Sequence, residues 1–146
     1  MEFTCGTDII EIQRIKESIE SLGDKFLKRV YTKKEIEYCE SKKAQKYQHY
    51  AARFAAKEAA FKAISKYIDD KYEVSWTDFE VVNDENGRPI LKLFNESIEE
   101  TKKEIVRKIK QMDLSLSHCK EYAVANVVVV GDVPNRSKIE QKGQTS

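Results

Sequence analysis

Several features that assign a chain to a common class are scarce in this sequence. Two prolines and five glycines among 146 residues are too few for a flexible linker. The three cysteines, Cys5, Cys39 and Cys119, form no CxxC pair, so we expect neither a disulfide framework nor a zinc site. No apolar run approaches the roughly 20 residues of a membrane span, and no signal-peptide pattern opens the chain. These absences favour a protein of the reducing cytoplasm, with no membrane attachment.

An excess of charge of one sign is also missing. Lys and Arg number 26 and Asp and Glu number 25, which argues against a general nucleic-acid binder. No GxxxxGK[ST] phosphate-binding loop occurs either. Charge is nevertheless uneven, because residues 25–34 contain five basic side chains and no acid: Lys25, Lys28, Arg29, Lys33 and Lys34. This stretch predicts a basic surface for an acidic partner, unless it is only a solvated helix face.

The order of the predicted elements indicates an α+β fold in one domain, residues 1–130, followed by a polar tail, 131–146. Helices are expected from helical apolar spacing, from a capping-box pattern and from alanine content: 12–22, ending at Gly23; a helix starting after Thr32; 47–68; and 97–112. Strands are expected at 3–9, 78–82, 90–94, 114–117 and 123–130, with a hairpin loop at 84–87. We expect the helices to pack on an antiparallel sheet. The apolar run 127–130 predicts a strand buried on both faces.

Two acidic residues stand in apolar surroundings. Glu58 shares a helix side with Phe54 and Phe61, so we predict that it lies on a buried face and needs compensation. An ion pair with Lys62, four residues later, or incomplete burial of that face would be simpler explanations. Asp8 ends an apolar extended segment, where the alternative role is to cap the following helix.

Taken together, the two acids indicate a site for a hard cation. Magnesium fits best, because it is usually held by one or two carboxylates together with water and substrate phosphates. Three basic side chains, Arg53, Lys57 and Lys62, flank Glu58 on its helix. A helix that offers an acid for the metal and basic groups for phosphate suits a metal-bound pyrophosphate. Mixed charges also occur on ordinary exposed helices.

Four segments, in order along the chain, resemble the holo-[acyl-carrier-protein] synthase family of 4′-phosphopantetheinyl transferases. Residues 6–15, GTDIIEIQRI, are similar to its opening G-x-D-I-x-x-x-x-R-I pattern. Residues 53–63, RFAAKEAAFKA, resemble its R-F-A-A-K-E-A helix. Asn86 to Pro89 are similar to a turn of the family, and residues 116–123 to its closing strands.

The resemblance implies a fold of the 4′-phosphopantetheinyl transferase type, forming a homotrimer with a site at each subunit interface. It implies that Asp8 and Glu58 bind Mg²⁺, and that Arg14, with basic residues of the first helices such as Lys25 and Lys28, contacts an acyl carrier protein. It also implies a set of residues around coenzyme A: Arg53, Lys57, Lys62, Asn86, Gly87, Arg88, Pro89 and His118.

The implied reaction moves the 4′-phosphopantetheine arm of coenzyme A to a serine of apo acyl carrier protein and releases 3′,5′-ADP. Lys62 is expected to stabilise the leaving phosphate. Glu58 is the first candidate for the base that takes the serine proton. His118 is the second, although a histidine at a strand end is often only a surface hydrogen-bonding residue. Two other functions stay open: another magnesium-dependent phosphotransferase or nucleotide hydrolase, and a non-enzymatic binding module with a basic face.

Overall fold

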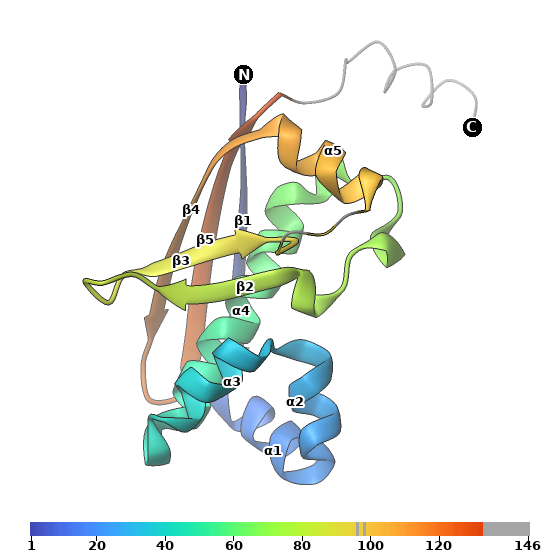
Figure 1. Ribbon diagram of the computed structural model, residues 1–146. Helices are drawn as coiled ribbons and strands as arrows, with labels where there is room; N and C mark the ends of the chain where they lie inside the picture. Colours follow the sequence, from blue (N-terminus) through green and yellow to red (C-terminus); the bar gives the residue numbers. More distant parts are fainter. Residues whose placement is uncertain (96, 98, 133–146) are drawn as a thin grey trace, which may run out of the picture.

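The computed structural model describes residues 1–95, 97 and 99–132. A three-stranded antiparallel sheet has β5 (Tyr122–Gly131) at its centre, between β1 (Glu2–Glu11) and β4 (Ile109–His118). A second, two-stranded sheet is the hairpin of β2 (Phe79–Asn83) and β3 (Pro89–Leu93). Figure 1 shows this hairpin running across the direction of the three long strands.

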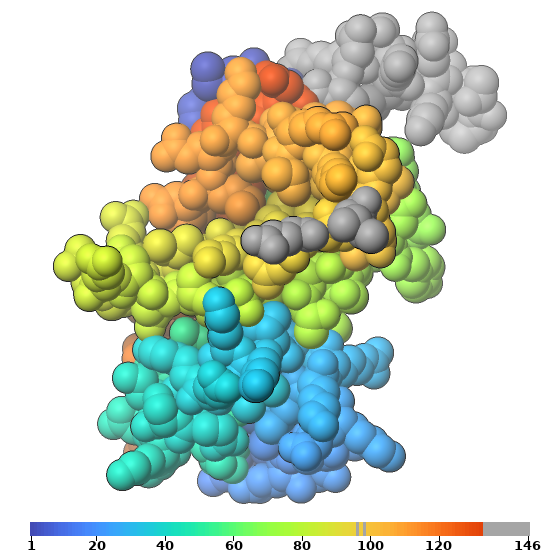
Figure 2. All heavy atoms as spheres, viewed as in Figure 1, coloured from blue at the N-terminus to red at the C-terminus, as the bar shows by residue number. Residues whose placement is uncertain are grey.

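The helices occupy three places around these sheets. Their bounds are α1 (Ile12–Leu22), α2 (Asp24–Val30), α3 (Lys33–Glu40), α4 (Lys46–Ile64) and α5 (Glu100–Lys108). The long helix α4 packs along β1 and β5. Helices α1 to α3 gather at one end of the molecule, drawn in blue to cyan in Figure 2, and α5 lies near the other end. The predicted α+β class is therefore confirmed.

Local signals account for several helix ends. Helix α1 ends at Gly23, whose φ of 59° is in the left-handed region that favours glycine. Thr32 and Glu35 form the predicted capping box at the start of α3. Helix α2 has no counterpart among the bounded elements that the sequence predicts, because its seven residues are too few for a periodic pattern.

Small side chains bring α4 close to the sheet. Alanines dominate its buried surface, and on β1 the facing residue is Gly6. A Cβ atom placed on Gly6 would lie 1.9 Å from the main-chain oxygen of Ala59, so no larger side chain fits without moving the helix. Side chains two positions apart share a strand face. Asp8 therefore faces α4 as well.

Two predictions about the second half of the chain are wrong. The helix expected over 97–112 ends at Lys108, and Ile109 and Met112 belong to β4; Ile98 lies outside the described residues. Strand β5 is not covered on both faces, since Val127 and Val129 are buried but Val128 is 44% exposed. An apolar run does not reveal which of its faces the same chain covers.

The outward face of the three-stranded sheet carries exposed apolar side chains among polar ones such as Thr7 and Asn126. It carries Phe3, which is 73% exposed, and Ile9, which is 62% exposed, beside Val128 on the neighbouring strand. Scattered exposed apolar side chains are ordinary on a protein surface, so these three residues do not by themselves identify a contact surface. This face lies on the side of β1 opposite to Asp8.

The predicted tail begins slightly too early. Strand β5 reaches Gly131, which pairs with Glu2 and Ile109, and the Asp132 amide donates to the Lys108 carbonyl at 2.9 Å. The rest of the predicted tail, 133–146, lies outside the described residues. Within the described part, no helix is long and apolar enough to cross a membrane. All three cysteines are free thiols.

Candidate active site

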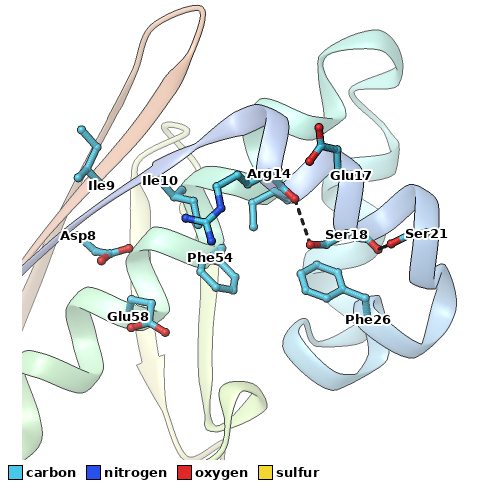
Figure 3. Close-up of a pocket in the computed structure, with 11 residues that line it drawn as sticks. Asp8, Ile9, Ile10, Arg14, Glu17, Ser18, Ser21, Phe26, Phe54 and Glu58 are labelled. Atoms are coloured by element: carbon cyan, nitrogen blue, oxygen red, sulfur yellow. Dashed lines mark hydrogen bonds between the residues drawn. The ribbon is translucent and has the colours of Figure 1, made fainter.

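Asp8 and Glu58 face one cavity of about 600 Å³ between β1, α1, α2 and α4. Asp8 comes from the inward face of β1, and Glu58 extends from α4 as a half-buried side chain. Figure 3 shows both carboxylates on the same side of the cavity, with Arg14 and Phe54 next to them. The structure thus brings together two acids that are 50 positions apart in the sequence.

The two carboxylates influence each other electrostatically. Burial raises the pKa of Glu58, the negative charge of Asp8 raises it further, and the Lys62 ammonium partly opposes both effects. A divalent cation between the two groups would relieve this repulsion. No cluster of three or more His, Cys, Asp or Glu side chains able to hold a metal occurs in residues 1–95, 97 and 99–132. A pair of carboxylates suits magnesium, which keeps several waters and binds substrate phosphates.

The prediction that Glu58 lies on a buried face of its helix is wrong, because that face is only half-buried. Arg53 and Lys57 are buried, whereas Phe54, Glu58 and Phe61 are half-buried. Helix α4 is enclosed on several sides, so the alternation of large apolar residues does not identify its inner face. The half-covered face that the sequence left open as an alternative is the one observed.

The other simple explanations for the two acids also differ from the structure. Lys62 pairs with Asp8, at 3.3 Å between Nζ and Oδ1, and no ion pair joins it to Glu58 among the described contacts. Asp8 does not cap the first helix, because β1 continues to Glu11, the residue before α1. Both acids are therefore free of the local structural roles considered for them.

The role predicted for Lys57 differs from its placement in the structure. Its ammonium is fully buried, lies 2.6 Å from the Glu35 carboxylate and donates to the main-chain oxygens of Trp76 and Phe79. The expectation that Lys57 contacts a phosphate of coenzyme A does not fit this placement, because its three donors are already used inside the protein. A lysine in an alternating acidic and basic motif does not reveal whether it faces solvent or the core.

The predicted contacts for a carrier protein lie near the cavity. Arg14 lines it, and in Figure 3 its guanidinium points from α1 toward Phe54. Lys25 and Lys28 are exposed on α2, whose Phe26 also lines the cavity. Arg14 and Phe26 therefore line the cavity, whereas Lys25 and Lys28 are exposed on the same helix as Phe26 but do not line it.

A second group of residues surrounds Arg53. Its side chain is 3% exposed, and its guanidinium lies 4.0 Å from the centre of the Tyr38 ring. Neither Nε nor Nη2 finds a hydrogen-bond partner in the part of the chain that the structure describes. Buried donors without partners are costly, so this guanidinium is suited to receive an anion.

Histidines extend this basic group. The rings of His49 and His118 lie 6.5 Å apart, and His49 also contacts the Tyr38 ring edge to face. Burial lowers the pKa of His49, and the positive charges of Arg53, Lys42 and His118 lower it further. The group therefore holds more positive charge than its own residues neutralise.

The residues predicted to share one cleft do not meet within a single chain. Arg53, His118 and the loop Asn86 to Pro89 are all absent from the described lining of the Asp8 cavity. That loop is shaped by Asp84, whose Oδ1 accepts from the amides of Asn86 and Arg88, and by Gly87 with φ of 81°. The Arg88 guanidinium pairs instead with Asp113, at 3.2 Å. Within one chain, these residues therefore do not line the cavity of Asp8 and Glu58.

Comparison with known proteins decides the family. The family model described as the 4′-phosphopantetheinyl transferase superfamily matches residues 4–127. This chain belongs to that superfamily. Holo-[acyl-carrier-protein] synthase of Ruminiclostridium cellulolyticum is 46% identical over 135 residues, covering 90% of this chain and 96% of the relative. The resemblance stated from the motifs is confirmed, and the enzyme class is transferase.

Solved structures of relatives share the fold of this transferase. A holo-(acyl-carrier-protein) synthase of Bacillus anthracis in complex with CoA (3′,5′-ADP) superposes with a TM-score of 0.67 at 38% identity, covering 88% of this chain and 96% of that chain. A synthase–CoA complex from Chronobacterium ammoniagenes gives a TM-score of 0.74 at 27% identity, covering 90% of this chain and 99% of that chain.

Three residues of the group around Arg53 escaped the sequence analysis: Tyr38, Lys42 and His49. His49 had one usable signal, since it is one of only two histidines in the chain. Its proximity to His118 depends on how α4 packs against β4, and no local pattern encodes that contact.

Proposed function

We propose that this transferase moves the 4′-phosphopantetheine arm of coenzyme A to a serine of an apo acyl carrier protein and releases 3′,5′-ADP. The observation that carries the proposal is the meeting of Asp8 and Glu58 at one cavity, with Lys62 paired to Asp8, in a chain of this superfamily. Relatives named holo-[acyl-carrier-protein] synthase and the CoA complexes among solved relatives support the same substrate pair.

The proposed metal ligands are Asp8 and Glu58. Their two carboxylates, close enough for one to raise the pKa of the other, suit a single Mg²⁺. When bound, magnesium would neutralise negative charge on the pyrophosphate oxygens of coenzyme A. Lys62 is paired with Asp8 in the free protein, and its ammonium would contact a phosphate oxygen instead if a bound metal neutralised that carboxylate.

The proposed chemical step is a displacement at the β-phosphorus of coenzyme A. A bond forms between the serine oxygen and this phosphorus, and the bond to the bridging oxygen breaks, so that oxygen leaves with 3′,5′-ADP. Glu58 accepts the serine proton, and Lys62 donates hydrogen bonds to the departing phosphate. His118 remains the alternative base.

We further propose that Arg53, His49 and His118 bind another phosphate of coenzyme A, together with the hairpin loop of Asn86 to Pro89. The unpartnered Arg53 donors support this assignment. In one chain, however, this half-site is separate from the Asp8 cavity. We propose a homotrimer, because each complete site can then combine half-sites from two neighbouring subunits. The sheet face that carries the exposed residues Phe3, Ile9 and Val128 is the proposed surface for assembly.

The carrier protein is proposed to dock over the cavity rim through Arg14, Lys25 and Lys28, because basic groups there attract an acidic partner. We place the transferase in the cytoplasm. Its free thiols suit a reducing compartment.

One experiment separates the proposal from its rivals. The protein is mixed with coenzyme A, Mg²⁺ and apo carrier protein, and the carrier is weighed by mass spectrometry. Addition of the phosphopantetheine arm supports the transferase. Breakdown of coenzyme A without any carrier indicates a hydrolase, whereas carrier binding without a mass change indicates a binding module.

A further inference from the structure

Lys57, the residue before Glu58, forms a buried ion pair with Glu35. Lys57 Nζ lies 2.6 Å from Glu35 Oε1, and both side chains are 0% exposed. The same ammonium donates to the Trp76 oxygen at 3.1 Å and to the Phe79 oxygen. All three donors of this lysine are therefore used within the protein.

Glu35 is equally engaged. Its Oε1 accepts from the Thr32 amide at 2.9 Å, and its Oε2 accepts from the Val81 amide at 3.0 Å. The pair thus ties together the start of α3, strand β2 and the middle of α4. A buried pair whose hydrogen bonds are all satisfied is sensitive to geometry, because moving any one element leaves a charge or donor without its partner.

The segment held by Lys57 borders Glu58. A cavity of about 220 Å³ is lined by Glu58, Phe61, Trp76 and Phe79, with Lys57 and Ser75. Trp76 also stacks on Phe54, with ring centres 4.8 Å apart, and Phe54 lines the larger cavity. The position of Trp76 therefore determines the surroundings of Glu58 on two sides.

We propose that the Glu35–Lys57 pair positions Glu58 and the Trp76 wall for the transfer reaction without contacting either substrate. Lys57 is a positioning residue that sets the rotation of α4 at the residue before Glu58, and Glu35 holds Lys57. Displacing a reacting group by about 1 Å costs roughly 100-fold in rate. The inference rests on the proposed transfer activity.

The test compares Glu35→Gln, Lys57→Met and the double variant Glu35→Gln/Lys57→Met. Exposed Glu37→Gln, on the same helix as Glu35, and exposed Lys66→Met serve as matched controls. Each single variant leaves one buried group without its partner and lowers the melting temperature. The double variant removes both charges and regains much of that loss. Its kcat stays at least about 10-fold below wild type, while KM for coenzyme A changes less than about twofold.

Two kinetic outcomes overturn the proposal. Recovery of kcat together with melting temperature in the double variant means that the pair only stabilises the fold. A higher KM for coenzyme A in Lys57→Met, with Glu35→Gln unchanged in both constants, means that Lys57 binds substrate directly. Should the double variant not fold, kcat and KM of Glu35→Gln decide, because its amide can still accept from Val81.

A second readout needs no turnover. Trp76 is the single tryptophan of the chain, so its fluorescence reports directly on its surroundings beside Glu58. We expect a red-shifted emission maximum in the double variant and in Glu35→Gln, and no shift in the two controls. Unchanged emission in both overturns the proposal. Absence of arm transfer by the wild type would refute the proposed function instead, and emission would still judge whether the pair positions Trp76.

Discussion

The Lys62 ammonium lies 3.3 Å from Asp8 Oδ1 and also donates to the Thr7 carbonyl at 3.0 Å. Asp8 is therefore already neutralised by a cation that belongs to the protein. The lysine side chain is 52% exposed, so this contact can exchange for another at little cost. A metal ion at Asp8 and Glu58 would compete with Lys62 for the same carboxylate.

Removing Lys62 should separate metal binding from catalysis. We expect Lys62→Met to bind Mg²⁺ several-fold more tightly than wild type, because one competing positive charge is gone. Arm transfer should fall by about 100-fold or more, since the charge on the leaving phosphate loses its donor. Titration calorimetry with Mg²⁺ and the carrier mass-shift rate measure the two effects, with exposed Lys66→Met as the control. Weaker Mg²⁺ binding would contradict competition between lysine and metal.

Neutralising either acid should abolish transfer in a folded protein. We expect Asp8→Asn and Glu58→Gln to leave the circular dichroism spectrum unchanged while the mass-shift rate falls to background. Mg²⁺ should raise the melting temperature of wild type and not of either variant, because a ligand stabilises only the state that binds it. Glu17→Gln, at the same cavity but away from the acids, is the control. Near-normal transfer by both variants would remove the metal site.

The motifs predicted most of the secondary structure and singled out two acids that the structure brings to one cavity, but they did not predict the surroundings of these acids. The capping box of Thr32 and the glycine after Leu22 are local signals, and local signals survive folding. Whether Lys57 or Glu58 faces the core depends on what packs around α4, which is decided by residues far away in sequence. For the same reason, the sequence alone could not show that Arg53 does not line the cavity of Asp8.

Binding of a phosphate at the second half-site should be linked to proton uptake by His49. In the free protein, burial and the charges of Arg53, Lys42 and His118 hold its pKa below the ordinary 6.5. A bound phosphate should raise the pKa of His49. The affinity for 3′,5′-ADP should therefore increase as the pH falls toward the pKa of His49 in the free protein. The free energy of unfolding of the free protein depends on pH in the opposite direction to the affinity for 3′,5′-ADP. The unfolded chain takes up the proton first, so stability falls as the pH falls below about 6.5.

Proton NMR of the two imidazoles, with and without 3′,5′-ADP, measures this shift. Arg53→Met should raise the His49 pKa in the free protein, because one neighbouring positive charge is removed. It should also weaken 3′,5′-ADP binding. An identical His49 titration with and without the nucleotide would place the phosphate elsewhere.

Two inactive variants should restore each other if sites are shared between subunits. Glu58→Gln lacks one half-site and Arg53→Met lacks the other. After unfolding and refolding together in equal amounts, random trimers should regain about a quarter of the wild-type sites. The mass-shift rate of the mixture, compared with each variant refolded alone, measures this. No recovery in mixed trimers that are demonstrably formed would place each complete site within one chain.

Charge reversal on α2 should affect the carrier protein alone. We expect Lys25→Glu/Lys28→Glu to raise KM for the carrier at least about 10-fold at low salt and to leave KM for coenzyme A unchanged. The difference should shrink as salt screens the surface. A matched reversal at exposed lysines elsewhere, Lys66→Glu/Lys103→Glu, should have little effect. Equal loss in both double variants would indicate a response to net charge only.

Gly6 has no side chain beyond a hydrogen atom, and this sets how closely β1 packs against α4. A Cβ atom at this position would lie only 1.9 Å from the Ala59 oxygen, so β1 and α4 can pack this closely only around a glycine. Asp8 lies two residues after Gly6 on β1, and Glu58 lies next to Ala59 on α4. Replacement by alanine would push strand and helix apart and widen the distance between the two acids. The spacing of the two proposed metal ligands therefore depends on Gly6, two residues before Asp8, which has no side chain of its own.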